Sequence, residues 1–203
     1  ISGADGEAVL AIANSEEIVY SDVDKLGEYQ HKFYYIQKHI DKILELPLVN
    51  KKAIKERNFK VVIDCGNSTG GISVPELLVA LGVTDVVELF TNPNGRFPHN
   101  PEPLPEHLGT IAHEVKHQKA DVGLVVDPDV DRLAIVCENG DMFGEEYTLV
   151  SIADYVLKHT PGNVVSNLSS TQALRDVAVK HKVEHHQSAV GEVHVVSMMK
   201  EVN

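Results

Sequence analysis

Short apolar runs alternate with segments of helical spacing through the middle of this chain. The apolar runs predict strands over residues 60–64, 86–90, 122–126 and 133–138. Residues 74–81 and 105–119 have helical spacing and separate the first three runs, and Gly82 is placed to end the first helix. This β-α-β-α-β-β order predicts an α/β fold, with a mostly parallel, mixed sheet between two layers of helices.

The same alternation begins again after Gly144 and predicts part of a second, similar domain. Its expected elements are helices over residues 145–159 and 171–181 and strands over residues 163–167 and 183–186. The first 35 residues are polar and acidic, and although residues 5–13 and 22–35 have helical spacing, we expect no closed core there. The predicted division is therefore residues 1–35, a complete domain over residues 36–143, and part of a further domain over residues 144–203.

The loop after the third apolar run carries the most chemistry. It reads Asp127-Pro128-Asp129-Val130-Asp131-Arg132, which places three carboxylates at alternate positions before a guanidinium. Carboxylates this close repel one another unless a cation neutralises them, and their oxygens select Mg²⁺, Ca²⁺ or Mn²⁺. Pro128 fixes its own φ and biases Asp127 toward an extended conformation. The loop therefore predicts a metal site, with Arg132 able to bind an oxyanion through two hydrogen bonds.

Two other interpretations of this loop are weaker. One is a solvated acidic turn, but alternating carboxylates after a buried strand are uncommon in turns. The spacing from Asp127 to Glu138 also matches an EF-hand, but the position that needs glycine holds Arg132, and residues 133–137 read as a strand. A Mg²⁺ site for phosphoryl transfer is the preferred interpretation.

The composition is that expected of a cytoplasmic globular protein. A net charge of −12 argues against binding to nucleic acid or to an anionic membrane, because both require basic patches. No apolar stretch approaches the ~20 residues that a membrane-spanning helix requires. Cys65 and Cys137 are too few for a disulfide framework, so we expect reduced, buried thiols.

Three further motifs are interpreted as structural. The segment from His113 to His117 matches the zinc-protease pattern His-Glu-x-x-His, but its histidines project away from the apolar face of their helix. The Gly-rich turn of residues 65–71 lacks the spacing of a nucleotide-binding P-loop and predicts a close-packed turn between strand and helix. His185 and His186 are neighbours on a predicted strand and therefore point to opposite faces.

The Asp-rich loop, with Ala120-Asp121-Val122-Gly123 before it, resembles the metal loop of the α-D-phosphohexomutases. This is the family of phosphoglucomutase, phosphomannomutase and phosphoglucosamine mutase. Residues 61–70 resemble the opening of the family's second domain, residues 97–104 its Pro-rich connection, and residues 188–191 a turn of its third domain. The resemblance implies the end of domain 1 in residues 1–35, domain 2 in residues 36–143, and the start of domain 3 in residues 144–203.

The resemblance also implies a reaction. The parent enzyme would interconvert hexose 1-phosphate and hexose 6-phosphate through a hexose 1,6-bisphosphate, with a phosphoserine as donor and acceptor. On this resemblance, Asp127, Asp129 and Asp131 hold Mg²⁺ against the phosphoserine, and Arg132 contacts phosphate or sugar. Neither the hexose nor the oligomeric state is predicted.

The nucleophile of the family is absent from this sequence. It is a serine in a Thr-Ala-Ser-His-Asn-type loop, and no such pentapeptide occurs here. We therefore expect an internal fragment of a longer enzyme, inactive by itself. The alternatives are a Mg²⁺-dependent phosphatase of the HAD class, which places its Asp-x-Asp pair after an early strand instead, and a non-enzymatic Ca²⁺-binding module.

Overall fold

The computed structural model describes residues 2–15 and 18–202. They belong to two units, one ending at Tyr35 and the other beginning at Ile36. Ile1 and Asn203, the outer ends of the first and last predicted pieces, lie outside the described residues. The two units are considered separately below.

The first unit contains one α-helix, α1 (Gly3–Ala13), close to its predicted position. A reciprocal cap begins it: the Ser2 hydroxyl accepts from the backbone N–H of Asp5, and the Asp5 carboxylate accepts from that of Ser2. The predicted helix over residues 22–35 is wrong: residues 22–34 form only the 3₁₀ turn η1 (Val23–Lys25), and the next helix begins at Tyr35. Side chains in this segment are exposed, so no packing offsets the cost of ordering a helix.

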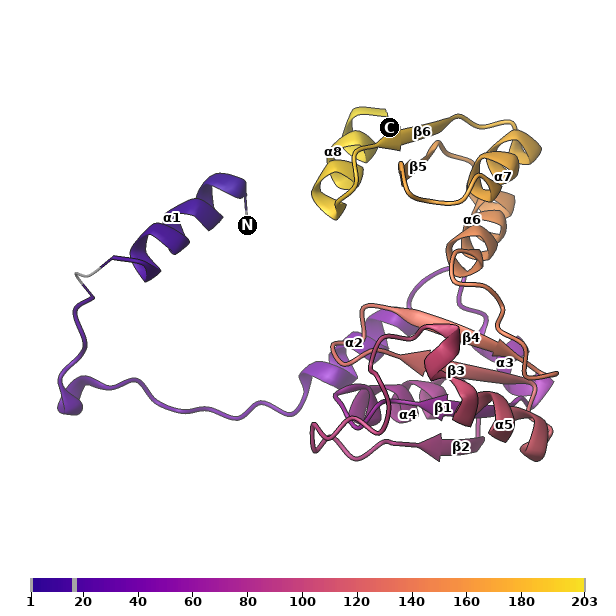
Figure 1. Ribbon diagram of the computed structural model, residues 1–203, viewed down its shortest axis with the longest axis horizontal. Helices are drawn as coiled ribbons and strands as arrows, with labels where there is room; N and C mark the ends of the chain where they lie inside the picture. The colour runs from indigo at the N-terminus through magenta and orange to yellow at the C-terminus, as the bar shows by residue number, and fades with distance from the viewer. Residues whose placement is uncertain (1, 16–17, 203) are drawn as a thin grey trace. The chain divides into compact units, whose positions relative to one another are not determined.

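The second unit contains a four-stranded sheet (Figure 1). Its strands, in spatial order, are β2 (Asp85–Leu89), β1 (Lys60–Asp64), β3 (Val122–Val126) and β4 (Leu133–Cys137). β1 pairs in parallel with β2 and β3, whereas β4 pairs antiparallel with β3. The predicted α/β fold with a mixed sheet is therefore confirmed, and the Asp-rich loop is the hairpin between β3 and β4.

Helices cover both faces of this sheet. They are α3 (Lys51–Arg57) and α4 (Gly70–Leu81) on one face and α5 (Gly109–Gln118) on the other. The helix α2 (Tyr35–Leu44) precedes α3 in the chain, and the 3₁₀ turn η2 (Pro105–His107) precedes α5. On one face, Ile111 and Val115 of α5 pack with Val62 in a fully buried cluster. On the other face, Leu78 of α4 packs with Ile63. α3 was not predicted, and α4 begins earlier than the predicted Val74.

Gly123 allows α5 to lie close against β3. An added Cβ at Gly123 would lie 2.8 Å from Val115 Cγ2 and 3.0 Å from Val136 Cβ. Gly123→Ala should therefore lower the free energy of unfolding by about 1–3 kcal/mol, measured by urea denaturation. Gly109→Ala is the control, since an added Cβ there meets nothing within 4 Å and alanine favours the helix. Equal destabilisation by both variants would contradict this packing.

The remaining elements repeat the alternation of helix and strand. They are α6 (Tyr147–His159), β5 (Val164–Asn167), α7 (Ala173–His181), β6 (His185–Ser188) and α8 (Glu192–Val202). β5 and β6 pair in parallel. β6 begins two residues later than predicted, and α8 was not predicted. Hydrogen bonds from Lys158, Lys180 and His181 lower the pKa of Asp154, so this carboxylate joins α6 to α7.

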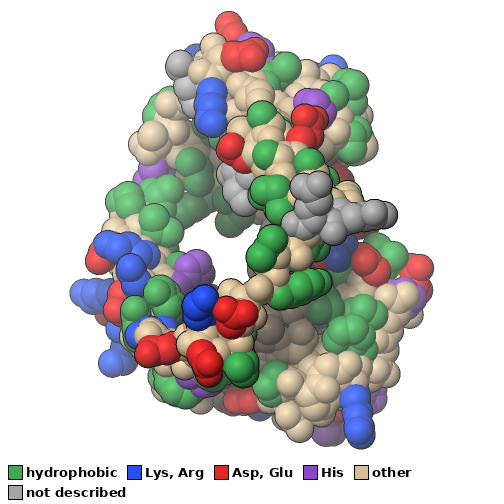
Figure 2. All heavy atoms as spheres, turned by 90° about the vertical axis from the view of Figure 1, so that its left-hand side faces the viewer, with side chains coloured by type: hydrophobic (Ala, Val, Ile, Leu, Met, Phe, Trp, Pro, Cys, Tyr) green, Lys and Arg blue, Asp and Glu red, His purple; other side chains and the backbone are tan. Residues whose placement is uncertain are grey.

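The surface is mixed in character. Figure 2 shows hydrophobic, acidic and basic side chains interspersed on one face of the molecule. Exposed apolar side chains include Leu10 of α1 and Val193 of α8. Scattered exposure of this kind is normal for folded proteins. Within the described part of the chain, no helix combines the length and apolar character needed to cross a bilayer.

Candidate metal centre

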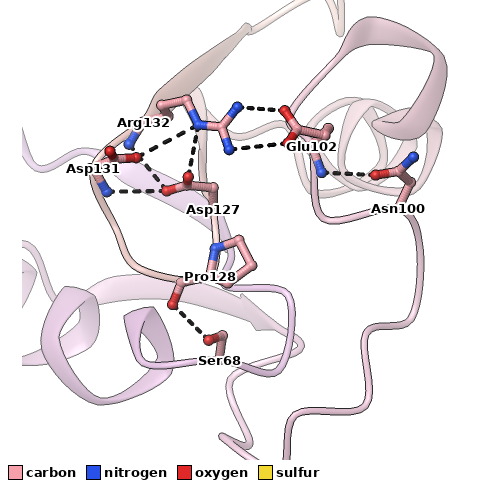
Figure 3. Close-up of polar contacts among 7 residues, drawn as sticks. All are labelled: Ser68, Asn100, Glu102, Asp127, Pro128, Asp131 and Arg132. Atoms are coloured by element: carbon pink, nitrogen blue, oxygen red, sulfur yellow. Dashed lines mark hydrogen bonds and ion pairs between the residues drawn. The ribbon is translucent and has the colours of Figure 1, made fainter. Parts of the chain in front are cut away.

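Three loops meet beside the carboxyl ends of β1 and β3. They are the turn of residues 65–69 after β1, the Pro-rich connection of residues 97–104, and the Asp-rich loop of residues 127–132 (Figure 3). The carboxyl ends of parallel strands face the same way, and the connecting loops there commonly form ligand sites in α/β folds. The order of the strands thus brings together segments that are far apart in sequence.

Asp127 organises the Asp-rich loop from inside. Its Oδ1 accepts from the backbone N–H groups of Asp131 and Arg132, both at 3.1 Å, and its Oδ2 accepts from Arg132 Nε at 2.8 Å. Burial alone would raise the pKa of Asp127, but the hydrogen bonds from Arg132 and Asp131 outweigh it, and the pKa lies below its ordinary value. An ionised, buried Asp127 therefore fixes the backbone of the loop.

Asp129 and Asp131 are exposed beside Asp127. One carboxylate oxygen from each of these three residues lies within 4.8 Å of the others, and in the described residues this is the one such group of at least three candidate ligands. The neighbouring carboxylates of Asp127 and Asp129 raise the pKa of Asp131. A cation would relieve this repulsion. Three hard oxygen donors, two of them open to solvent, fit Mg²⁺, which usually keeps several water ligands.

Val130 holds the loop in a strained conformation. Its φ is +64°, a region that β-branched residues rarely adopt. Val130→Gly should therefore raise the free energy of unfolding by about 1 kcal/mol, because the relieved strain exceeds the added flexibility of the unfolded chain. Val179→Gly, at an exposed position of α7, should have the opposite sign, since glycine weakens a helix interior. Thermal unfolding of both variants measures the difference, and destabilisation by Val130→Gly would contradict the assigned strain.

The turn after β1 supports the Asp-rich loop through two hydrogen bonds. Ser68 Oγ and Thr69 Oγ1 each donate to the carbonyl of Pro128 at 2.7 Å. The turn therefore has a structural role, as predicted: it holds the Asp-rich loop in place through Pro128. The same turn holds Cys65, whose pKa burial raises to about 12, so this thiol is inert.

Arg132 lies between two carboxylates (Figure 3). Its Nε donates to Asp127, while Nη1 and Nη2 donate to the two oxygens of Glu102, the latter at 3.2 Å. The hydrogen bond from Arg132 lowers the pKa of Glu102. The pKa of Arg132 is raised by its hydrogen bonds to Glu102, which has the larger effect, and to Asp127. Sequence reasoning included Arg132 among the site residues but missed Glu102.

A second buried carboxylate fixes the Pro-rich connection. Asp64, at the end of β1, is 1% exposed, and its Oδ2 lies 3.0 Å from His99 Nε2. The other ring nitrogen of His99, Nδ1, lies 2.8 Å from the carbonyl oxygen of Asn100, so both ring nitrogens have a polar partner. Nothing in the spacing of Asp64 and His99 along the chain predicts this pair. His113 and His117, by contrast, are exposed on α5, as predicted.

Two family models match nearly all of the second unit. "Phosphoglucomutase/phosphomannomutase, alpha/beta/alpha domain II" matches residues 37–140, and "domain III" of the same family matches residues 144–203. The chain belongs to the phosphoglucomutase/phosphomannomutase family. The suspected resemblance to the phosphohexomutases is thereby confirmed.

Individual members of the phosphoglucomutase/phosphomannomutase family agree with this assignment. "Phosphoglucomutase/phosphomannomutase" of Thermococcus kodakarensis is 32% identical over 93% of this chain and 41% of its own length. "Phosphoglucosamine mutase" of Sulfurovum sp. is 32% identical over 91% of this chain and 43% of its own length. A family structure from Burkholderia thailandensis superposes with a TM-score of 0.71 and 29% identity, covering 82% of this chain and 36% of that one. The chain thus spans about two fifths of the length of these two curated relatives.

Proposed function

We propose that this chain is the metal-binding part of a phosphohexomutase that interconverts hexose 1-phosphate and hexose 6-phosphate. Relatives named phosphoglucomutase, phosphomannomutase and phosphoglucosamine mutase support this proposal. In it, residues 1–35 end domain 1, residues 36–143 form domain 2, and residues 144–203 begin domain 3. The proposal includes a hexose 1,6-bisphosphate intermediate and a cytoplasmic location.

The observation that carries the proposal is the convergence of three carboxylates beside an arginine. Asp127, Asp129 and Asp131 would hold Mg²⁺, which when bound offsets negative charge on a phosphoryl oxygen. Asp127 sets the loop geometry, because its Oδ1 accepts from the backbone N–H groups of Asp131 and Arg132. Arg132 would bind a phosphate oxygen pair, since a planar guanidinium matches two oxygens at once.

The reaction also needs a nucleophile, and the proposal places it outside these residues. The chain alone should therefore show no mutase activity on glucose, mannose or glucosamine 1-phosphate, with or without a hexose 1,6-bisphosphate primer. The longer reading frame that contains this chain should turn over at least one of them. A coupled assay for the 6-phosphate measures both.

Two outcomes would contradict the proposal. One is a longer protein that folds and binds Mg²⁺ yet converts none of the three substrates. The other is turnover by the chain alone that Asp129→Ala abolishes, which would indicate a phosphatase-like site complete within these residues. Trapping of an aspartyl phosphate with a fluoroberyllate would then identify that site.

A further inference from the structure

Arg132 has two kinds of hydrogen-bond partner, and they differ in exposure. The Nε atom donates at 2.8 Å to Asp127, whose side chain is 0% exposed. The two Nη atoms donate to Glu102, and the side chains of Arg132 and Glu102 are 51% and 49% exposed. The Nε contact is therefore internal to the loop, whereas the Nη end faces solvent.

Glu102 is held at that end by a stiff segment. It lies between Pro101 and Pro103, and a following proline restricts the residue before it to extended conformations. The Asn100 side-chain oxygen accepts from the backbone N–H of Glu102 at 3.0 Å. His99, which precedes Asn100 in the chain, contacts the buried carboxylate of Asp64. The carboxylate is thus presented to Arg132 by backbone that has little freedom to move.

Arg132 and its Nη partner Glu102 both line a groove of about 450 Å³. Its lining includes Glu102, Asp131, Arg132, Glu145 and Thr148. This groove borders the candidate metal centre, because Asp131 belongs to both. An anion that entered it would meet the end of the guanidinium that Glu102 now covers.

We propose that the Glu102 carboxylate is a placeholder for a phosphoryl group at the Nη end of Arg132. A carboxylate and a phosphoryl group both offer two oxygens to the planar guanidinium. Because exposed ion pairs contribute little net stability, the Glu102 contact is the one that an incoming phosphoryl group displaces. The buried Nε contact to Asp127 stays in place and keeps the guanidinium at the metal loop. This inference rests on the proposed function, because the proposed reaction is the source of the phosphoryl group.

Titration of the chain with inorganic phosphate, followed by the NMR signal of the Arg132 Nε–H group, tests this exchange. Glu102→Gln should tighten phosphate binding by about threefold or more, because the competing carboxylate is gone. Glu145→Gln is the control for charge: it removes the same charge from the same groove, and none of the hydrogen bonds of Arg132 within the described residues goes to Glu145. We expect it to tighten binding much less. The gain should vanish when Arg132→Lys is combined with Glu102→Gln.

Glu102→Asp separates displacement from charge. It keeps the negative charge, but its shorter side chain on the same stiff backbone cannot reach both Nη atoms, so it should also tighten phosphate binding. Unchanged or weaker binding in both Glu102 variants would overturn the proposal, as would a gain that persists with Arg132→Lys. The probe contains neither sugar nor metal. Exchange without hexose phosphate turnover in the longer protein would therefore refute the proposed function alone, and turnover without exchange would refute the placeholder alone.

Discussion

On the proposed function, replacing both Asp129 and Asp131 by Asn in the longer protein is expected to lower kcat/KM for a hexose phosphate about a thousandfold. Both side chains are exposed and neither lies in the core, so the change should remove the candidate metal ligands while the fold remains. A bound divalent cation stabilises charge on a transferring phosphoryl group by several kcal/mol, and a thousandfold loss corresponds to about 4 kcal/mol. Initial rates at saturating Mg²⁺ measure the effect.

The control for this double change removes the same charge elsewhere. Glu106 and Glu138 are exposed, and Glu106→Gln plus Glu138→Gln alters the net charge equally. That variant should keep kcat/KM within about twofold, because screened surface charges act weakly at a distance. Comparable losses in the two double variants would show that general electrostatics, and not metal binding, explains the result.

Asp127→Ala should lower the free energy of unfolding by about 2–4 kcal/mol, because it leaves two backbone N–H groups and the Arg132 Nε without their buried acceptor. Asp129→Ala, in the same loop, should change it by less than about 0.5 kcal/mol. Urea denaturation of the metal-free proteins measures both. Equal stability of the two variants would remove the structural role assigned to Asp127.

The effect of Asp127 should also depend on pH. Its pKa is lowered in the folded state, so its stabilisation is present above the ordinary aspartate pKa of about 3.9. The stabilisation is lost as the pH falls through the lowered value. The difference in stability between the wild type and Asp127→Ala should therefore shrink in strong acid, and a constant difference would contradict this assignment.

The central sheet could be predicted from the sequence because its strands are short apolar runs bounded by turns. β1 and β3 appear at their predicted residues, and β2 is displaced by one. The three aspartates could likewise be identified, since a cluster of carboxylates in one loop is visible without any tertiary contact. Residues 22–35 have helical spacing yet form no such helix, because helical spacing does not show whether a partner surface exists to bury the apolar face.

The supports of the metal loop could not be predicted, because they join residues distant in sequence. Ser68 and Pro128 are 60 positions apart, and Glu102 and Arg132 are 30 apart. Only the parallel order of β1 and β3 brings the turn after β1 beneath the Asp-rich loop. A serine in a turn and a glutamate between prolines carry no local signal of such contacts. Their roles follow from the topology of the sheet.

Titration of the chain with Mg²⁺, followed by backbone amide NMR shifts, tests most directly whether the Asp-rich loop is the metal site. We expect shifts centred on residues 127–132, with affinity in roughly the millimolar range because the loop supplies only three protein ligands. The shifts should disappear in the variant that carries Asp129→Asn and Asp131→Asn. Mg²⁺ binding that survives in that variant, or micromolar Ca²⁺ binding that displaces Mg²⁺ from the loop, would contradict a Mg²⁺ site for phosphoryl transfer.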